Sequence, residues 1–167
     1  MVDQGQVRDF EGLACYLFSL KLFQAAYQLA NHLPDYERYN LADQLRRAAL
    51  SVLLNIAEGY GRYHYLDKLR FFYIARGSLC ETLSVFIASH RVGYTDDQQL
   101  AWVRQTEAEA EKSLNGYINF VRKQQQGKSE FGHKLVREDM FEYDVHQLHD
   151  VYPSGIDDQE SGKLPSP

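Results

Sequence analysis

The chain has 167 residues, of which 44% are hydrophobic, and this length is enough for one well-buried domain with an additional segment. Its 23 acidic and 18 basic side chains give a formal net charge of −5. Because there is no run of about eighteen apolar residues, and no charged start followed by a short apolar core and a cleavage site, we predict neither a membrane span nor a signal peptide and expect a cytoplasmic protein.

The acidic excess is confined to the C-terminal part of the chain. Residues 1–126 contain fourteen acidic and fourteen basic side chains, so the net negative charge lies in residues 127–167. Between residues 38 and 76 the balance is reversed, with seven basic against three acidic side chains. A basic zone on an otherwise neutral body attracts phosphate, although dedicated nucleic-acid binders usually carry a larger basic excess.

Two neighbouring apolar stripes at helical spacing predict a first helix over residues 9–33 that packs on more than one other helix. One stripe contains Leu13, Leu17, Leu20, Phe23, Tyr27 and Ala30, and the other contains Leu22, Ala26, Leu29 and Leu33. We expect Pro34 to end this helix, because the residue before a proline is pushed out of the helical region.

A second helix is predicted over residues 41–60, with Asn40 as its N-cap. Its apolar stripe contains Leu41, Leu45, Ala48, Val52 and Ile56. Gly59 and Gly61 are expected to end it, since glycine readily takes the left-handed conformation that closes a helix. A polar stripe contains Arg47, Ser51, Asn55, Glu58 and Arg62. Such a stripe is either a solvated face with local ion pairs or a surface that hydrogen-bonds to another molecule.

The third and fourth helices are predicted over residues 65–91 and 96–125, with a turn at Gly93. The seam of the third contains Tyr65, Leu69, Phe72, Arg76, Leu79, Leu83, Phe86 and His90, and that of the fourth contains Leu100, Val103, Glu107, Ala110, Leu114, Tyr117 and Val121. Antiparallel helices would place Arg76 level with residues 110–112. We therefore predict a structural ion pair from Arg76 to Glu107 or Glu111.

Two local signals concern the fourth helix. Thr95 and Gln98 predict a capping box at its start, in which the threonine caps forward and the glutamine reaches back. Gly116 lies in its middle, where glycine costs about 1 kcal/mol relative to alanine. We interpret Gly116 as permitting the close approach of a neighbouring helix.

Residues 127–167 are predicted to form an acidic C-terminal extension. Phe141, Val145, Leu148 and Tyr152 would share a helix face, which suits docking on the body or on a neighbouring subunit, whereas residues 153–167 are predicted to be disordered. The four long helices with short links predict an all-α fold, an antiparallel up-down-up-down four-helix bundle over residues 1–126.

A catalytic site needs convergent nucleophile, base and orienting groups, and none is recognisable in the bundle sequence. Cys15 and Cys80 lie in apolar helical patterns, which predicts two buried reduced thiols rather than a disulfide or a metal site. His146 and His149 have metal-ligand spacing if helical, but a solvated polar face is the simpler interpretation. We expect a protein that is not an enzyme and that has no cofactor and no bound metal.

Three segments of the chain resemble a known family. They are LADQLRRAALSVLLNIAEGYGR at residues 41–62, FYIARGSLCETL at residues 72–83 and LNGYINFVRK at residues 114–123. In this order, within residues 9–126, they resemble the bacterial four-helix bundle proteins encoded within intervening sequences of large-subunit ribosomal RNA genes, also called ribosomal-protein-like. That family is similar to the accessory variability proteins of diversity-generating retroelements.

The resemblance implies an antiparallel bundle that assembles as a homopentameric ring, and the retroelement relatives bind nucleic acid and a reverse transcriptase through basic surfaces. The residues that fall in the family motifs are Arg46, Arg47, Asn55, Glu58, Arg62 and Arg76. The neutral body and the acidic extension depart from a basic nucleic-acid binder, and they leave room for a protein partner.

Two functions are therefore in question. The first is an oligomeric nucleic-acid-associated accessory protein that binds RNA or an RNA–DNA hybrid, with phosphates contacted by Arg46, Arg47, Arg62, Lys68 and Arg70. The alternative is a protein-interaction scaffold that does not bind nucleic acid. A ring needs two different complementary patches on each subunit. Candidates for one patch are Tyr60, Tyr63, Tyr65 and Phe71, for which capping the end of the bundle core is an equal alternative.

Overall fold

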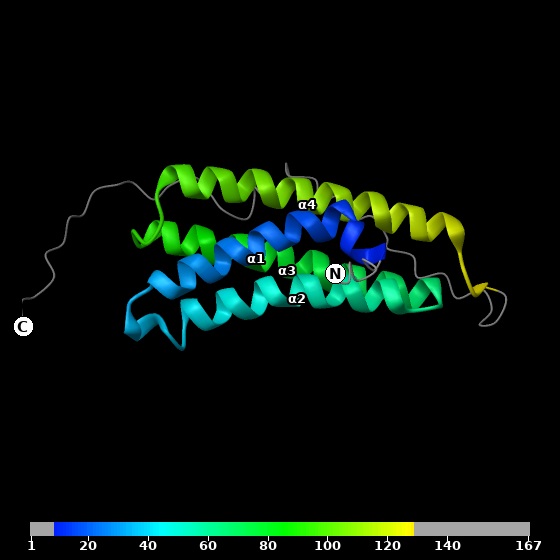
Figure 1. Ribbon diagram of the computed structural model, residues 1–167, viewed down its shortest axis with the longest axis horizontal. Helices are drawn as coiled ribbons and strands as arrows, with labels where there is room; N and C mark the ends of the chain where they lie inside the picture. Colours follow the sequence, from blue (N-terminus) through cyan, green and yellow to red (C-terminus); the bar gives the residue numbers. More distant parts are fainter. Residues whose placement is uncertain (1–8, 129–167) are drawn as a thin grey trace, which may run out of the picture. The chain divides into compact units, whose positions relative to one another are not determined.

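The computed structural model describes residues 9–128, which form four α-helices and two short 3₁₀ turns (Figure 1). The α-helices are α1 (Ala14–His32), α2 (Leu41–Gly61), α3 (Tyr65–Arg91) and α4 (Asp97–Gln124), and the 3₁₀ turns are η1 (Asp9–Gly12) and η2 (Asp35–Glu37). The predictions for the acidic extension, including the helix face at residues 141–152 and the pair His146 and His149, lie outside the described residues.

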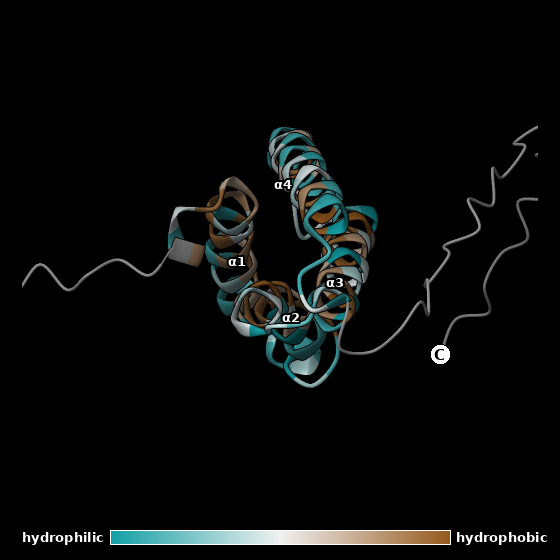
Figure 2. Cartoon of the chain, turned by 90° about the vertical axis from the view of Figure 1, so that its right-hand side faces the viewer, coloured by the Kyte–Doolittle hydropathy of each residue, from teal (hydrophilic) through white to brown (hydrophobic). Residues whose placement is uncertain are grey.

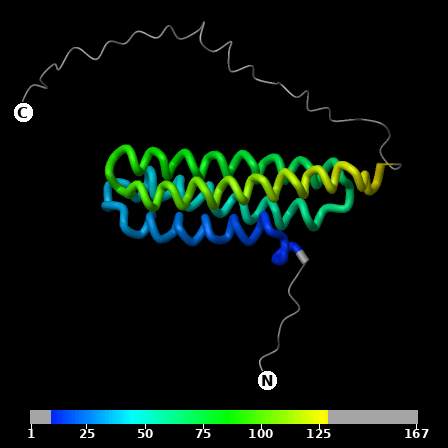
Figure 3. The backbone as a smooth tube through the Cα atoms, turned by 90° about the horizontal axis from the view of Figure 1, so that it is seen from above, coloured from blue at the N-terminus to red at the C-terminus, as the bar shows by residue number. Residues whose placement is uncertain are grey.

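The four helices run in alternating directions (Figure 3) and close into a bundle. Helix α1 packs on α2 and α4, and α3 also packs on α2 and α4. Figure 2, which looks along the helices, shows α2 between α1 and α3 and on the opposite side from α4. Residues 9–128 contain no strand, so the predicted all-α four-helix bundle is confirmed.

The apolar stripes predicted for α2 and α4 form the bundle core. In α2 the buried side chains include Leu45, Val52 and Ile56, and in α4 they include Leu100, Val103, Ala110, Leu114 and Val121. They meet Leu22 and Ala26 of α1 and Phe72 and Leu79 of α3 in one cluster. Full burial of a leucine or phenylalanine side chain stabilises the fold by about 1.5–3 kcal/mol, so this cluster is the main source of stability.

The predicted start of α1 is wrong, whereas its predicted end is confirmed. The helix begins at Ala14 rather than at residue 9, because residues 9–12 form a 3₁₀ turn in which the Leu13 amide donates to the Phe10 carbonyl at 3.1 Å. It ends at His32, and Leu33 before Pro34 has an extended backbone. The predicted effect of Pro34 is thus confirmed.

Asn40 stands at the predicted N-cap of α2, but its side chain makes no capping hydrogen bond. Glu37 of η2 acts instead, since its Oε2 accepts from the Asn40 side-chain amide at 3.0 Å and from the Leu41 backbone amide at 3.5 Å. The negative charge of a carboxylate at this position also interacts favourably with the positive end of the helix dipole. The prediction was right about the position and wrong about the capping group.

The two glycines near the end of α2 do not have the predicted conformation. Positive φ angles among residues 9–128 occur at Gly93, Gln125 and Gly127, and not at Gly59 or Gly61. Gly59 is buried inside the helix, where an added Cβ would lie 2.7 Å from Cε1 of Phe72. Its lack of a side chain permits the ring of Phe72 to pack against α2.

Gly116 was predicted to permit close helix packing, and this is wrong within the chain. A Cβ built on Gly116 would meet no atom within 4 Å, and the same holds for Gly77 of α3. Both glycines lie on the outer faces of their helices, away from the core. The close approach that was predicted for Gly116 occurs at Gly59.

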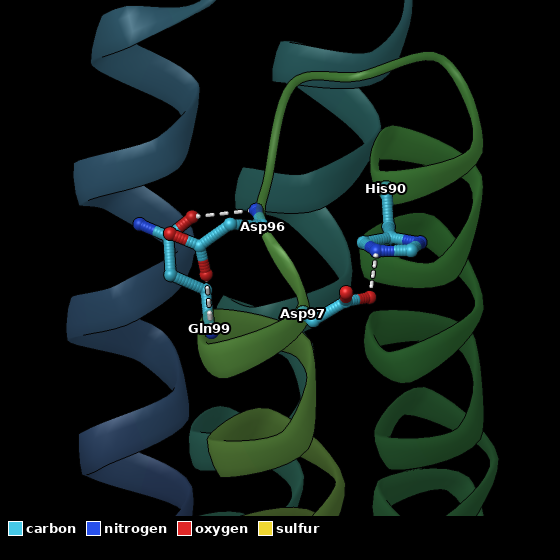
Figure 4. Close-up of polar contacts among 4 residues, drawn as sticks. All are labelled: His90, Asp96, Asp97 and Gln99. Carbon is cyan, nitrogen blue, oxygen red and sulfur yellow. Dashed lines mark hydrogen bonds and ion pairs between the residues drawn. The ribbon is translucent and has the colours of Figure 1, made fainter.

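The capping box of α4 lies one residue later than predicted (Figure 4). The Gln99 amide donates to Oδ1 of Asp96 at 2.7 Å, and the Asp96 amide donates to Oε1 of Gln99 at 3.1 Å. The hydroxyl of Thr95 is buried and makes no hydrogen bond. The capping box lies one residue later because Asp96 directly follows Thr95. An aspartate caps at least as well as a threonine, and its negative charge also interacts favourably with the helix dipole.

The two cysteines differ in exposure. Cys15 is buried, as predicted, and burial raises the pKa of its thiol to about 11. Cys80 is exposed, so the prediction of a second buried thiol is wrong. It lies on the outer part of α3, whose buried stripe passes through Leu79 instead.

Helix α3 is long and apolar enough to cross a membrane, judged by length and composition alone. Length and composition alone are weak evidence for a membrane span, because the core helix of a bundle passes the same test. In the structure its apolar stripe packs on α2 and α4.

Candidate nucleic-acid interface

The five basic residues predicted to bind phosphate do not form one site. Arg46 and Arg47 lie in the second turn of α2, whereas Arg62 follows its last residue and Lys68 and Arg70 lie in the first turns of α3. At 1.5 Å per residue, Arg47 and Arg62 are separated by about 22 Å along the helix. The basic excess of residues 38–76 is therefore divided between the two ends of the bundle.

Arg46 joins α2 to the end of α1. Its Nη2 donates to the Ala30 carbonyl and to Oδ1 of Asn31, both at 3.1 Å. Its guanidinium also lies 6.0 Å from the centre of the Tyr27 ring. An arginine that satisfies a carbonyl in the last turn of a helix caps that end. Arg46 thus has a structural role in this chain.

Arg47 is exposed and pairs within its own helix. Its Nε lies 3.4 Å from Oδ2 of Asp43, and it also donates to the side chain of Gln44. An exposed pair of this kind contributes about 0.3–0.5 kcal/mol. Its guanidinium therefore remains accessible to another partner.

Arg62 and Lys68 lie together at the turn between α2 and α3. Lys68 donates to the Tyr60 carbonyl at 3.2 Å, and burial lowers the pKa of its ammonium group. Arg62 pairs with Glu58, and its guanidinium lies 4.9 Å from the centre of the Phe71 ring. This turn therefore combines cationic and aromatic side chains.

The C-terminal part of α4 reaches the same end of the bundle. The Tyr65 amide at the start of α3 donates to the Gln126 carbonyl at 3.0 Å, which holds the two helix ends together. Arg122 and Lys123 occupy the last turn of α4. We call Arg62, Lys68, Arg70, Arg122 and Lys123 the basic end.

Tyr73 of α3 brings two further arginines close together. Arg122 donates to the Tyr73 hydroxyl at 2.5 Å, and its guanidinium lies 5.7 Å from the ring centre. The guanidinium of Arg76 lies 5.1 Å from the same ring centre, and its Nη1 donates to Oδ1 of Asn115 at 3.3 Å. Tyr73 and Arg122 were not predicted from the sequence. The register predicted for Arg76 places Tyr73 level with residues 113–115, so it would have missed this contact. In the structure Arg76 lies beside Asn115, about one turn further along α4 than predicted.

The predicted ion pair of Arg76 with Glu107 or Glu111 stays a prediction. Glu107 is buried, with 7% exposure, and burial followed by the charge of Glu111 raises the pKa of its carboxyl. Burial, Glu107 and Glu111 also raise the pKa of the Cys80 thiol, and Arg76 opposes this shift. Arg76 of α3 and Glu107 and Glu111 of α4 therefore all act on the Cys80 thiol.

The predicted subunit-contact aromatics have different environments. Tyr65 is 8% exposed and belongs to the core, so it caps the bundle end and is not available to another subunit. Tyr60 is partly buried, 6.2 Å from the ring centre of Phe10, and Phe71 is partly buried beside Arg62. Tyr63 is 55% exposed. Of the four, Tyr63 presents the most surface.

Other exposed apolar side chains lie along the helices. They are Leu17 of α1, Leu50 and Leu54 of α2, Ile74 of α3, and Trp102 and Phe120 of α4. Leu17 was predicted to lie in a packed apolar stripe of α1, but it is 47% exposed, so that part of the prediction is wrong. The others were not expected from the sequence to be exposed. They lie at helical positions outside the buried stripe of each helix, and this spacing in the sequence would have indicated that they are exposed.

The groups at the basic end bind by charge and hydrogen bonding. Guanidinium and ammonium groups beside aromatic rings suit phosphates and unstacked bases. Within residues 9–128 there is no group of three or more histidine, cysteine, aspartate or glutamate side chains able to hold a metal ion.

Comparison with known proteins gives a family and a structural relative. The family described as 23S rRNA-intervening sequence protein matches residues 11–116. A solved structure from the S23 ribosomal protein family of Bacteroides thetaiotaomicron, whose function is unknown, is similar at 21% sequence identity and a TM-score of 0.58. The match covers 63% of this chain and 95% of that one, and it shows a shared fold. No curated protein matches the chain.

Proposed function

Because the chain belongs to the family of 23S rRNA-intervening sequence proteins, we propose that it is a non-enzymatic, homo-oligomeric accessory protein that binds structured RNA. The observation that carries this proposal is the convergence of five basic side chains from the α2–α3 turn, α3 and α4 at one end of the bundle. The resemblance to retroelement accessory proteins extends the proposal to RNA–DNA hybrids and to a reverse transcriptase as partner.

The basic end has the properties that RNA binding needs. Arg70 and Lys123 are exposed, and the pair of Arg62 with Glu58 is itself exposed, so a phosphate can replace the carboxylate at little cost. Tyr63 directly follows Arg62, and its exposed ring, which packs edge-on against His64, is able to stack on an unpaired base. One subunit therefore offers a few phosphate contacts and one stacking surface.

Oligomerisation compensates for the modest charge of each subunit. A homo-oligomer, a homopentamer according to the resemblance, presents several basic ends to one RNA. Linked contacts of this kind raise the overall affinity by about 10²–10⁴ over that of a single contact, provided that their geometry permits simultaneous binding. A neutral body is thus compatible with RNA binding if the protein is multimeric.

The test is the binding of a fluorescent RNA hairpin and of an RNA–DNA hybrid to the full-length protein between about 50 and 200 mM salt. We expect binding that weakens steeply with salt, because each neutralised phosphate releases counterions. Arg70→Ala with Lys123→Ala should weaken binding and reduce the slope of log K against log salt by about one for each phosphate that is no longer neutralised.

The matched control is Arg91→Ala with Arg104→Ala, which removes two exposed basic side chains away from the basic end. This variant should bind RNA as the wild type does. Equal weakening in both double variants would overturn the assignment to the basic end. Absence of binding by a well-formed multimer would favour the alternative, a protein-interaction scaffold, which the exposed Leu50, Leu54 and Ile74 support.

A further inference from the structure

One exposed stripe on α2 has an unusual order of side chains. It contains Asp43, Arg47, Leu50, Leu54 and Glu58 at steps of three and four residues, and Arg62, which directly follows the helix and pairs with Glu58, extends it. Leu50 is 37% exposed and Leu54 is 58% exposed. The buried stripe of α2 faces the core, and Figure 2 shows α1 and α3 on its two sides, so none of residues 9–128 covers this outer face. The stripe therefore has an apolar centre with one acid–base pair at each end.

The charges are already arranged along the stripe. Arg47 pairs with Asp43 at one end, and Arg62 pairs with Glu58 at the other. All four side chains are about half exposed or more. Each end thus presents an acid and a base side by side to whatever covers the leucines.

The stripe is complementary to itself when it is reversed. Read from Asp43 it runs acid, base, leucine, leucine, acid, base. In an antiparallel copy centred between Val52 and Leu53, Arg62 lies opposite Asp43 and Glu58 lies opposite Arg47. Leu54 and Leu50 come within one residue of facing each other. A parallel copy in register would instead place Arg47 opposite Arg47 and Glu58 opposite Glu58, which is repulsive. The charge order thus selects the antiparallel arrangement.

We propose that α2 pairs with α2 of a second copy of this chain, in antiparallel orientation, about a two-fold axis at the middle of the helix. The contact has four leucines at its centre and two clusters of four charges at its rim, the usual anatomy of a specific interface. It is isologous, with the same patch on both partners. It shares Arg62 with the basic end, whereas Arg70 and Lys123 lie on α3 and α4, and it would join two rings as readily as two single chains.

The decisive experiment uses two charge reversals, alone and mixed, with mass measured by light scattering on the full-length protein. Wild type should have a mass that is an even multiple of 19.4 kDa. Arg47→Glu places carboxylates opposite Glu58, and Glu58→Arg places guanidinium groups opposite Arg47. Each variant alone should have half the wild-type mass. Mixed in equal amounts they should recover the full mass, because every contact then pairs an acid with a base.

Two controls accompany this experiment. Leu54→Glu should also halve the mass, and mixing it with either reversal should not restore it, because a carboxylate then stands among the leucines. Arg104→Glu on α4 should keep the wild-type mass. Circular dichroism checks that each variant is helical, and recovery in the mixture itself requires folded partners.

The outcomes separate this contact from the proposed function. A wild-type mass that is an odd multiple of the chain mass, unchanged masses in the reversals, or a mixture that stays at half mass would each overturn the α2 contact. Salt-sensitive RNA binding by wild type in any of these cases would leave the proposed function standing. An even mass with full recovery in the mixture but no RNA binding would support the contact and overturn the RNA proposal.

Discussion

Gly59 and Gly77 show how differently one residue type acts in two helices. A Cβ at Gly59 would lie 2.7 Å from the fully buried ring of Phe72, whereas a Cβ at Gly77 would meet nothing within 4 Å. Gly59→Ala should therefore destabilise the protein, because overpacking costs about 1–3 kcal/mol and the gain in helix propensity of about 1 kcal/mol offsets only part of it. Urea unfolding at fixed protein concentration measures this.

Gly77→Ala is the matched control for that measurement. It should raise the free energy of unfolding by about 0.5–1 kcal/mol, because alanine is the better helix former and the site is open. A Gly59→Ala protein as stable as Gly77→Ala would show that Phe72 can move away, and the close approach at Gly59 would then have no energetic weight.

Glu107 gives a prediction about pH. Burial raises the pKa of its carboxyl in the folded state, so the native protein binds more protons than the unfolded chain between the unfolded and folded pKa values. Stability from this group is therefore lost as pH rises through that window. Glu107→Gln should be more stable than wild type at pH 7, and the difference should vanish below the unfolded pKa of about 4.3.

Thermal unfolding at a series of pH values measures this difference, with the exposed Glu109→Gln as control. The same measurement decides the ion pair predicted for Arg76. If Glu107→Gln is instead less stable than wild type at pH 7, the carboxylate has a favourable charged partner, and Arg76 is the predicted one.

At the scale of the helix, the start of α4 depends on Asp96. Its carboxylate accepts the Gln99 amide at 2.7 Å, whereas the buried hydroxyl of Thr95 makes no hydrogen bond. Asp96→Ala should lower the free energy of unfolding by about 0.5–2 kcal/mol, the range for removing an N-cap. Thr95→Val, which keeps the shape, should be neutral or stabilising. A larger destabilisation with Thr95→Val would restore the capping box predicted from the sequence.

The helix bodies were predictable and the helix ends were less so, for a physical reason. The body of α2 rests on a stripe from Leu45 to Ile56, and such a pattern survives an error at any one position. Each end depends on one or two hydrogen bonds. Glu37 rather than Asn40 supplies the acceptor at α2, and Asp96 rather than Thr95 supplies it at α4.

The candidate site was predictable only in part, for a similar reason. Arg62 and Lys68 are near in sequence and lie on the same turn, so counting charge along the chain found them. Counting also included Arg46, although Arg46 lies near the start of α2 and the turn follows the end of that helix. The pairing of Tyr73 with Arg122 joins residues 49 positions apart, and it requires the register between α3 and α4. Sequence proximity therefore detects sites at turns and misses sites between helices.

At the scale of the whole molecule, charge is unevenly distributed along the chain. Residues 129–167 contain nine acidic and three basic side chains, whereas residues 1–128 are close to neutral. A negative field from the same molecule lowers the local concentration of RNA and slows its approach. If the protein binds RNA, the C-terminal residues should weaken that binding through long-range repulsion.

Replacing the nine acidic residues by their amides tests this without shortening the chain. The formal net charge then changes from −5 to a positive value. We expect tighter RNA binding at low salt, several-fold in the dissociation constant, mainly through a faster association rate. The difference should shrink near physiological salt, where the Debye length is about 8 Å. A difference that is unchanged by salt would point to a specific contact of the acidic residues instead, because screening weakens a long-range field far more than a buried contact.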